Sequence, residues 1–329
     1  MPIRIARMAR WVALSTSLCL MICCASLNGT LRPRWQVLSQ KTIGHPSPIN
    51  SIIFFDELNG LALSALGLAS TTDGGAHWME RLDSGNRGFY SMRFVDRQNG
   101  WIVGAELKDA EEHSTVSSKS FRPMIMRTAD GGITWREINL EHFLGSEGTR
   151  FSKFSSLCFD PSGAAWIVGD VGIVEATVES DALRTSHVTM ARAELNDVSC
   201  LKSGEVWTAG RNGLIMYRKQ KEWESIQYPD GNAFFGRVKV IRDAVWLIGG
   251  TQAKGQNNVQ GLLLKIQNGN TWENKTPDEA GQLCDLDFNE SEGWLVGLKG
   301  QIFHTNSGGG QPGKKQLVRQ RTISSPFSS

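Results

Sequence analysis

The stretch Asn99-Gly100-Trp101-Ile102-Val103-Gly104 joins a tight-turn dipeptide to a short apolar strand, and its pattern recurs along the chain. The recurring tetrad is a tryptophan, two residues that usually favour strands and a glycine. It occurs at Trp101–Gly104, Trp166–Gly169, Trp207–Gly210, Trp246–Gly249 and Trp294–Gly297, with Leu61 in the equivalent place at the front of the series. A spacing of about forty residues, interrupted by two insertions, indicates an internal repeat.

A short alternating strand precedes each tetrad. These strands are Ser51–Phe54, Ser91–Phe94, Ser156–Phe159, Asp197–Cys200, Arg237–Val240 and Asp285–Phe288. Apolar residues at the second and fourth places predict that one face of each strand enters a core. The turn between strand and tetrad, such as Asp96–Gly100, carries the Asn-Gly chemistry typical of hairpins.

A third strand follows each tetrad after a glycine-bearing turn, as in Gly213–Met216. A second tryptophan series marks a fourth strand and consists of Trp78, Trp135, Trp223 and Trp272. Four antiparallel strands repeated six times predict an all-β fold, a six-bladed β-propeller. A seventh blade, too degenerate to recognise in the sequence, stays open as an alternative.

A propeller must close into a ring, and the two ends of the repeat region suggest how. The last unit ends at Phe303–Gly310 without a tryptophan strand of its own, whereas Arg34–Leu38 is a tryptophan strand without a blade. We therefore predict that residues 34–38 supply the outer strand of the last blade. The propeller then spans residues 34–310.

Composition excludes two classes of protein. Of 329 residues, 40% are hydrophobic, which is enough for a core and argues against wholesale disorder. The net charge is +2, but residues 1–25 and residues 311–329 together carry more positive charge than that. The body between them is therefore net acidic, which argues against nucleic-acid binding.

The two ends of the chain differ from its body. Arg4, Arg7 and Arg10 precede the uncharged stretch Trp11–Ala25, which has the length of a signal-peptide apolar region and is short for a membrane span. Residues 1–28 are expected to be a signal peptide or an N-terminal membrane anchor, and Cys23 and Cys24 leave a lipoprotein open. The protein is then periplasmic, secreted or membrane-anchored on the outer side. Residues 311–329 predict a basic, disordered tail able to contact an anionic membrane surface weakly.

Three cysteines, Cys158, Cys200 and Cys284, lie in the body of the chain. An odd number this small does not indicate a disulfide framework, so we expect buried apolar thiols. The chain has no Cys-x-x-Cys pair, and its six histidines share no spacing typical of a metal site. The sequence therefore predicts no metal and no cofactor.

Two units carry a longer motif between their third and fourth strands. Thr71–Trp78 and Thr128–Trp135 resemble the Asp-box, S/T-x-D-x-G-x-T-W, through Thr71, Asp73, Gly75 and Trp78 in the first and Thr128, Asp130, Gly132, Thr134 and Trp135 in the second. The carboxylate suits a turn in which it accepts backbone N–H bonds and a glycine adopts positive φ. A structural role is expected, so neither aspartate is a candidate for acid/base chemistry.

Together with the N-G-W-x-V-G segments, these motifs make residues 34–310 resemble the Asp-box propellers of the photosystem II stability/assembly factor type. The resemblance implies an exported protein that assists the assembly of a membrane complex by binding a partner protein, without catalysis. The chain departs from the family in having two good Asp-boxes and six recognisable units where seven blades are typical.

Strand order predicts where a partner would bind. In a four-stranded meander the second-to-third and fourth-to-first connections lie on the same face, and the long segments 105–124, 136–153, 178–194 and 251–261 all belong to these connections. Long loops on a rigid scaffold are where binding usually resides. The candidate binding residues on this face are Phe121, Arg122, Arg150, Arg211 and Lys254. The expected partner is a protein or a membrane-protein complex.

The alternative is a secreted sialidase-like glycoside hydrolase or a carbohydrate-binding propeller. A sialidase needs an arginine cluster, a Tyr/Glu pair and an acidic aspartate on its central face. Phe121-Arg122-Pro123 is only a weak echo of the sialidase F-R-I-P motif, and the tyrosines are limited to Tyr90, Tyr217 and Tyr228. Three arginines beside a Tyr/Glu pair would favour the enzyme.

Overall fold

The computed structural model describes residues 48–107, 121–140, 151–179, 182–241, 244–252, 255, 258–267, 271–289, 292–298 and 301–305. All of them lie in the compact unit Ile43–Ser329. The expectations for residues 1–28, 34–38 and 311–329 fall outside the described residues. Within the described ranges, no helix is long and apolar enough to cross a membrane.

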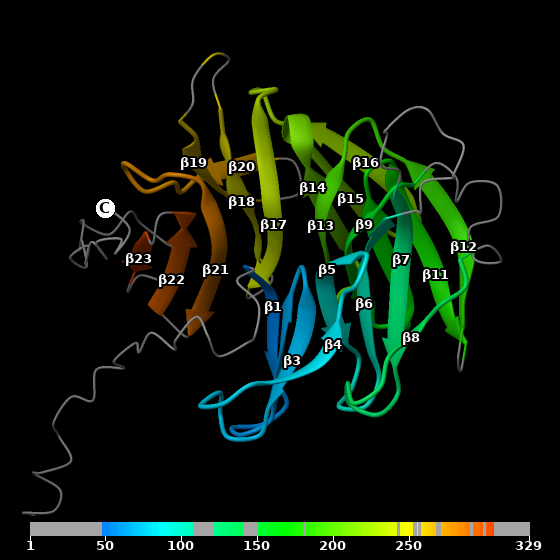
Figure 1. Ribbon diagram of the computed structural model, residues 1–329. Coiled ribbons are helices and arrows are strands. Elements are labelled where there is room, and N and C mark those ends of the chain that lie inside the picture. The colour runs from blue at the N-terminus through cyan, green and yellow to red at the C-terminus, as the bar shows by residue number, and fades with distance from the viewer. Residues whose placement is uncertain are drawn as a thin grey trace, which may run out of the picture. The chain divides into compact units, whose positions relative to one another are not determined.

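Six antiparallel sheets follow one another along the chain, and within each sheet neighbouring strands are consecutive in the sequence (Figure 1). Blade one contains β1 (Ile49–Phe54), β2 (Gly60–Ser64), β3 (Gly67–Thr71) and β4 (Met79–Asp83). Blade two contains β5 (Arg87–Phe94), β6 (Gly100–Leu107), β7 (Phe121–Thr128) and β8 (Arg136–Glu137). Blade three contains β9 (Phe154–Phe159), β10 (Ala164–Gly169), β11 (Gly172–Glu179) and β12 (Ala182–Met190).

Blade four contains β13 (Leu195–Cys200), β14 (Val206–Gly210), the 3-10 turn η3 (Arg211–Gly213), β15 (Leu214–Lys219) and β16 (Glu222–Gln227). Blade five contains β17 (Ala233–Ile241), β18 (Ala244–Thr251), β19 (Gln260–Gln267) and β20 (Thr271–Asn274). Blade six contains β21 (Leu283–Asn289), β22 (Glu292–Gly297) and β23 (Ile302–Thr305). The predicted all-β, six-bladed propeller is confirmed.

The glycine of each tetrad is required by a bulge in the first strand of the blade. In blade two the register shifts between Phe89 and Ser91, which brings the strand backbone against Gly104. A Cβ on Gly104 would lie 1.9 Å from the carbonyl oxygen of Gly88. Blades four and five repeat this approach, with 1.9 Å at Gly210 and 2.0 Å at Gly249. Because the obstructing atom is backbone in each case, no larger residue fits.

The tetrad tryptophans of blades two to five are buried, and in blades two, four and five a side chain of the third strand covers the indole. The Arg127 guanidinium lies 5.2 Å from the centroid of the Trp101 ring, and the Lys265 amine lies 5.3 Å from that of Trp246. In blade four the ring of Tyr217 stacks on Trp207 at a centroid distance of 4.6 Å. A cation or a ring over the indole gives the blade a polar covering while the tryptophan itself stays in the core.

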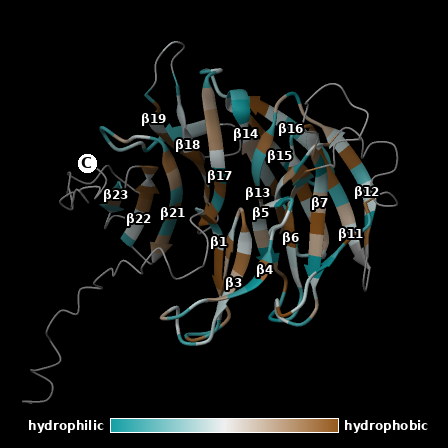
Figure 2. Ribbon diagram, viewed as in Figure 1, coloured by the Kyte–Doolittle hydropathy of each residue, from teal (hydrophilic) through white to brown (hydrophobic). Residues whose placement is uncertain are grey.

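Hydrophobic residues occur along the strands of the blades (Figure 2), and apolar side chains of successive blades form shared buried clusters. At the contact of blades two and three, Val103 and Ile125 pack with Phe154 and Leu157, all fully buried. The second place of the first strand is buried in blades two to six, as predicted, by Met92, Leu157, Val198, Val238 and Leu286.

Blade one does not follow this prediction. Ile52 and Phe54, at the second and fourth places of β1, are 58% and 43% exposed. The other first strands lie against the preceding blade, whereas this face of β1 is left open to solvent within the described part of the chain.

The expectation of buried thiols is wrong for two cysteines. Cys158 on β9 and Cys200 on β13 form a disulfide, with their Cα atoms 5.8 Å apart. The first strands of consecutive blades are neighbours, so two cysteines separated by 42 residues, about one repeat, meet across the contact between blades three and four. The separation of about one repeat was the feature of the sequence that pointed to this disulfide. Cys284 is a free thiol, and burial raises its pKa.

We predict that Gly104→Ala lowers the free energy of unfolding by about 3 kcal/mol, because the new methyl group would overlap a carbonyl oxygen that cannot rotate away. Urea denaturation measures the change. Gly231→Ala is the matched control, because no atom lies within 4 Å of a Cβ at that position. Equal effects of the two substitutions would contradict the role assigned to the tetrad glycine.

Replacing both Cys158 and Cys200 with alanine should lower stability by about 4 kcal/mol, because the disulfide restricts an unfolded loop of more than forty residues. Thermal denaturation of the variant and of the oxidised wild type tests this. Cys284→Ala serves as the control. A wild-type melting temperature that does not change on reduction would contradict the prediction.

Candidate functional site

The connections between strands gather on two faces of the propeller (Figure 1). One face holds the turns between first and second and between third and fourth strands, including residues 71–78 and 128–135, and we call it the Asp-box face. The other holds the second-to-third and fourth-to-first connections, including η3, and we call it the loop face.

Three of the four predicted long segments belong to the loop face, although strands occupy part of them. Residues 105–107 and 121–124 lie in β6 and β7, and residues 136 and 137 form β8. The prediction for residues 178–194 is wrong. These residues lie mostly in the end of β11 and in β12, because the third and fourth strands of blade three are longer than the motif spacing indicated.

Phe121 and Arg122 lie at the start of β7, paired with Leu107 and Glu106 of β6. The Phe121 side chain is 46% exposed. The Arg122 guanidinium pairs with the carboxylate of Glu106 and, at 2.8 Å, with that of Glu137. The exposed Phe121 ring is thus next in the chain to Arg122, whose guanidinium contacts two carboxylates.

A second charged group joins blades three and four on the loop face. The Glu194 carboxylate lies 2.5 Å from Lys153 Nζ and 2.9 Å from Arg211 Nε. Although burial opposes ionisation, the hydrogen bonds and charges of Lys153 and Arg211 lower the pKa of Glu194. Of the candidate binding residues, Phe121, Arg122 and Arg211 therefore fall in two groups that share no residue, while Arg150 and Lys254 lie outside the described residues.

On the Asp-box face, residues 128–135 form a closed set of hydrogen bonds. Thr128 Oγ1 donates to Asp130 at 2.7 Å and accepts the Gly132 N–H at 2.9 Å. Asp130 also accepts the Thr134 N–H at 2.9 Å and the Thr134 hydroxyl at 2.6 Å. The Trp135 indole N–H donates to the Gly132 carbonyl at 3.1 Å. Gly132 has φ +90°, which only glycine adopts readily.

Residues 71–78 repeat this arrangement with a histidine in place of the second threonine. Asp73 accepts the Thr71 hydroxyl at 2.8 Å and the His77 N–H at 2.9 Å, and His77 Nδ1 lies 2.6 Å from the other carboxylate oxygen. Hydrogen bonds from His77 and Thr71 lower the pKa of Asp73 to about 2.

Both carboxylates are thus engaged within their own turns. Burial opposes the ionisation of Asp130, yet hydrogen bonds from Thr134, Thr128 and Ile133 lower its pKa to about 2. A carboxylate ionised down to such low pH holds no proton to donate near neutrality, and its lone pairs are already occupied. This arrangement suits a turn and not an acid/base catalyst.

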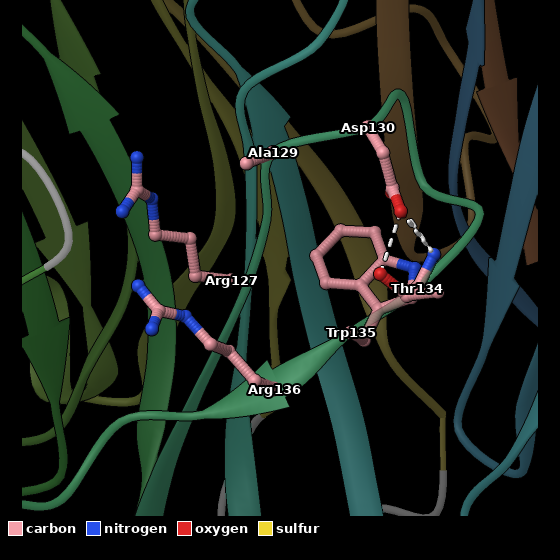
Figure 3. A pocket seen from close by; sticks show the side chains of 6 residues that line it. All are labelled: Arg127, Ala129, Asp130, Thr134, Trp135 and Arg136. Atoms are coloured by element: carbon pink, nitrogen blue, oxygen red, sulfur yellow. Dashed lines mark hydrogen bonds between the residues drawn. The ribbon is translucent and has the colours of Figure 1, made fainter.

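A shallow pocket of about 330 Å³ lies beside the second Asp-box (Figure 3). Arg127 and Arg136, which are opposite each other on β7 and β8, extend side by side on one side of it. Trp135 and the Asp130–Thr134 pair lie on the other side. Sequence reasoning missed both arginines, because only the strand register brings them together.

The structure contains a Tyr/Glu pair, which bears on the glycoside hydrolase alternative. The Tyr217 hydroxyl donates to the Glu224 carboxylate across β15 and β16. That hydrogen bond, with burial and the glutamate charge, raises the pKa of Tyr217 to about 12. A carboxylate beside a tyrosine is also how such a nucleophile is activated. Here the Tyr217 ring is stacked on Trp207, which gives it a packing role in blade four.

No group of three or more His, Cys, Asp or Glu side chains in the described part of the chain is arranged to hold a metal ion.

No protein-family model matches the chain. The chain is similar to the photosystem II assembly lipoprotein Ycf48 of Synechococcus sp. (strain CC9902), with 22% identity over 301 residues that cover 84% of this chain and 76% of that protein. Among solved structures, it resembles an ancestral GH74 enzyme with a TM-score of 0.53 and 12% identity, over 75% of this chain and 38% of that one. A structure of YCF48 bound to a D1 peptide gives a TM-score of 0.46 and 21% identity, over 81% and 94% of the two chains. The likeness to the GH74 enzyme concerns the fold alone.

Acid should weaken the Asp-box turns. The folded-state pKa of Asp130, about 2, lies below the ordinary value of 3.8, so its stabilising contribution is complete above about pH 4 and is lost as the pH falls towards 2. We expect Asp130→Asn to lower stability at pH 7 and to reduce the loss of stability between pH 4 and pH 2. Urea denaturation at several pH values measures both effects. Asp278→Asn, at an exposed position, is the control, and identical pH profiles for Asp130→Asn and the wild type would contradict the prediction.

Proposed function

We propose that this protein is an exported, non-catalytic β-propeller that assists the assembly of a membrane-protein complex by binding a protein partner through its loop face. The observation that carries the proposal is the similarity to an assembly lipoprotein along 84% of the chain. The six-bladed fold and the turns described above agree with a rigid scaffold.

The disulfide supports export. Disulfides such as Cys158–Cys200 form and persist in oxidising compartments, which lie outside the cytoplasm of most cells. Residues 1–28 have the composition of a signal peptide or an N-terminal anchor, and the similar Synechococcus protein is a lipoprotein. The protein would then be periplasmic, secreted or held on the outer side of a membrane, with the basic tail 311–329 able to make weak contact with that membrane.

The chemistry of the loop face suits a partner segment that carries both an apolar side chain and carboxylates. Phe121 offers an exposed ring, and Arg122 beside it forms ion pairs with Glu106 and Glu137. The Arg122 side chain is 41% exposed, so its remaining N–H groups can also donate to a carboxylate of the partner. Aromatic and arginine side chains are also the residues that most often dominate binding energy.

Non-catalytic action is supported by the state of the polar groups. Asp73 and Asp130 are occupied by their own turns, and the Tyr217 ring is stacked on Trp207 within blade four. We propose no cofactor and no nucleic-acid partner.

The test is co-purification of the full chain with proteins from solubilised membranes of the source organism. The wild type should retain a precursor of a membrane-protein complex, identified by mass spectrometry, and Phe121→Ala with Arg122→Glu should reduce its recovery about tenfold or more.

The matched control lies on the opposite face. Ile133→Ala with Arg97→Glu also changes an exposed apolar residue and an ion-paired arginine, and this variant should bind as the wild type does. Equal binding by both variants would contradict the assignment of the loop face. Failure of the wild type to retain any membrane-complex subunit would contradict the function itself.

A further inference from the structure

Two arginines lie directly opposite each other in blade two. The register of β7 and β8 pairs Arg127 with Arg136, so both side chains extend from the same face of the sheet. Figure 3 shows them side by side along one wall of the pocket of about 330 Å³ beside the second Asp-box. Like charges at directly opposed positions destabilise a sheet, and an anion that contacts both arginines reverses this effect.

The same two positions do not hold two cations in the other blades that the structure describes with four strands. One position is the third-strand residue opposite the tetrad tryptophan, or opposite Leu61 in blade one, and the other is the fourth-strand residue opposite it. The pairs are Ser70/Met79 in blade one, Glu175/His187 in blade three, Tyr217/Glu224 in blade four and Lys265/Glu273 in blade five. The blade fold therefore does not require a pair of arginines here.

The two arginines differ in how firmly they are held. Arg127 is 7% exposed, its guanidinium lies 5.2 Å from the centroid of the Trp101 ring, and its Nη2 donates to Asn99 Oδ1 at 3.3 Å. Arg136 is exposed on the outer strand. A guanidinium carries five N–H donors in a planar fork, so an arginine that makes such contacts can also donate to an oxyanion. Part of the site is thus arranged before a ligand binds, which lowers the cost of binding.

The polar side chains of the opposite wall are already engaged in the Asp-box turn. The Thr134 hydroxyl donates to Asp130 at 2.6 Å, and the Trp135 indole N–H donates to the Gly132 carbonyl at 3.1 Å. The Asp130 carboxylate, with a pKa of about 2, is negatively charged near neutral pH and repels an anion. Charge therefore directs an anion to the arginine wall, and the Trp135 ring offers an apolar surface beside it.

We propose that this pocket binds a phosphate group between Arg127 and Arg136, carried by a soluble phosphate monoester or by a lipid headgroup. The two guanidinium groups carry two positive charges. A phosphate monoester, with a charge of about −1.5 to −2 near pH 7 and three acceptor oxygens, matches both, whereas a single carboxylate matches one. The pocket volume lies at the lower end of the range for small-molecule sites, and Trp135 would contact the group that carries the phosphate.

This site lies on the Asp-box face, whereas the partner contacts proposed above lie on the loop face. The phosphate site therefore goes beyond the proposed function and does not depend on it. Failure of either proposal leaves the other unaffected.

Thermal denaturation of the full chain with inorganic phosphate tests the site. Phosphate also stabilises folded proteins in general, because it is excluded from their surface, so the measured quantity is the difference between the wild type and a variant. In about 50 mM phosphate near pH 7.5, against sodium chloride of equal ionic strength, the melting temperature of the wild type should rise about 3–5 °C more than that of Arg136→Gln.

Two further variants control for charge. Arg97→Gln removes an arginine whose side chain is 67% exposed on the same face but outside the pocket, and it should respond to phosphate as the wild type does. Arg136→Lys keeps the positive charge without the planar fork, so it should retain only part of the response. Equal responses of the wild type and Arg136→Gln would overturn the site. A response to acetate as large as that to phosphate would show that the pocket takes a single carboxylate, and would overturn the assignment of the ligand.

Sedimentation with lipid vesicles distinguishes the two sources of the phosphate. Phosphatidylcholine vesicles that contain phosphatidic acid, a phosphate monoester, are compared with vesicles that contain phosphatidylserine, adjusted to the same surface charge. A lipid headgroup as the source predicts that Arg136→Gln binds the phosphatidic acid vesicles about fivefold more weakly than the wild type and the phosphatidylserine vesicles equally well. Equal binding of the phosphatidic acid vesicles by both proteins, together with the thermal response to phosphate, assigns the site to a soluble phosphate ester.

Discussion

The contact between the bulged first strand of a blade and the strands of the preceding blade is the constraint on which this propeller depends. A twisted four-stranded sheet has two apolar faces and cannot cover both alone, so it is stable only between two others. The bulge turns the apolar residues that flank it, such as Phe154 and Leu157, into the preceding blade. Burial of each such side chain contributes about 1.5–3 kcal/mol. In blades two, four and five the same bulge brings the backbone so close to the second strand that only glycine fits there, whereas Ser64 has the equivalent place in blade one.

Polar groups connect the same blades. The side chain of Asn50, at the bulge of blade one, donates to the Phe89 carbonyl at 2.7 Å, and Asn196 donates to the Phe235 carbonyl at 2.9 Å. Buried Asp197 accepts both the Ser156 hydroxyl and the Val238 N–H, so it links blades three, four and five. These bonds satisfy backbone groups that the bulge removes from the strand ladder, and they orient successive blades in a way that apolar packing alone does not.

The two faces of this scaffold differ in how their charged residues are used. On the Asp-box face, Asp73 and Asp130 are used to hold short turns. On the loop face, charges occur in small groups, such as Lys153, Glu194 and Arg211, beside an exposed Phe121. Ion pairs at an exposed surface add little stability, so Arg211, whose side chain is 64% exposed, can form contacts with a partner at small cost to the fold.

Much of the fold could be predicted from the sequence repeat. The tryptophan tetrads and their spacing predicted six blades and their strand order, because a local hydrophobic period and a required glycine are properties of neighbouring residues. The candidate site was predicted less well. Phe121 and Arg122 were placed in a loop and lie on β7, and residues 178–194 were taken for a loop where β12 lies. Strand ends depend on pairing with a neighbour, which a motif does not reveal.

The amino-acid sequence by itself determined the number of blades, the order of their strands and the residues of the Asp-box turns. Only the tertiary structure decided which residues meet across strands and blades. It joined Cys158 to Cys200, set Arg127 beside Arg136, and left Ile52 exposed where its five equivalents are buried. The physical reason is that these outcomes depend on strand register within a blade and on the presence of a neighbouring blade, and neither can be read from a motif of neighbouring residues.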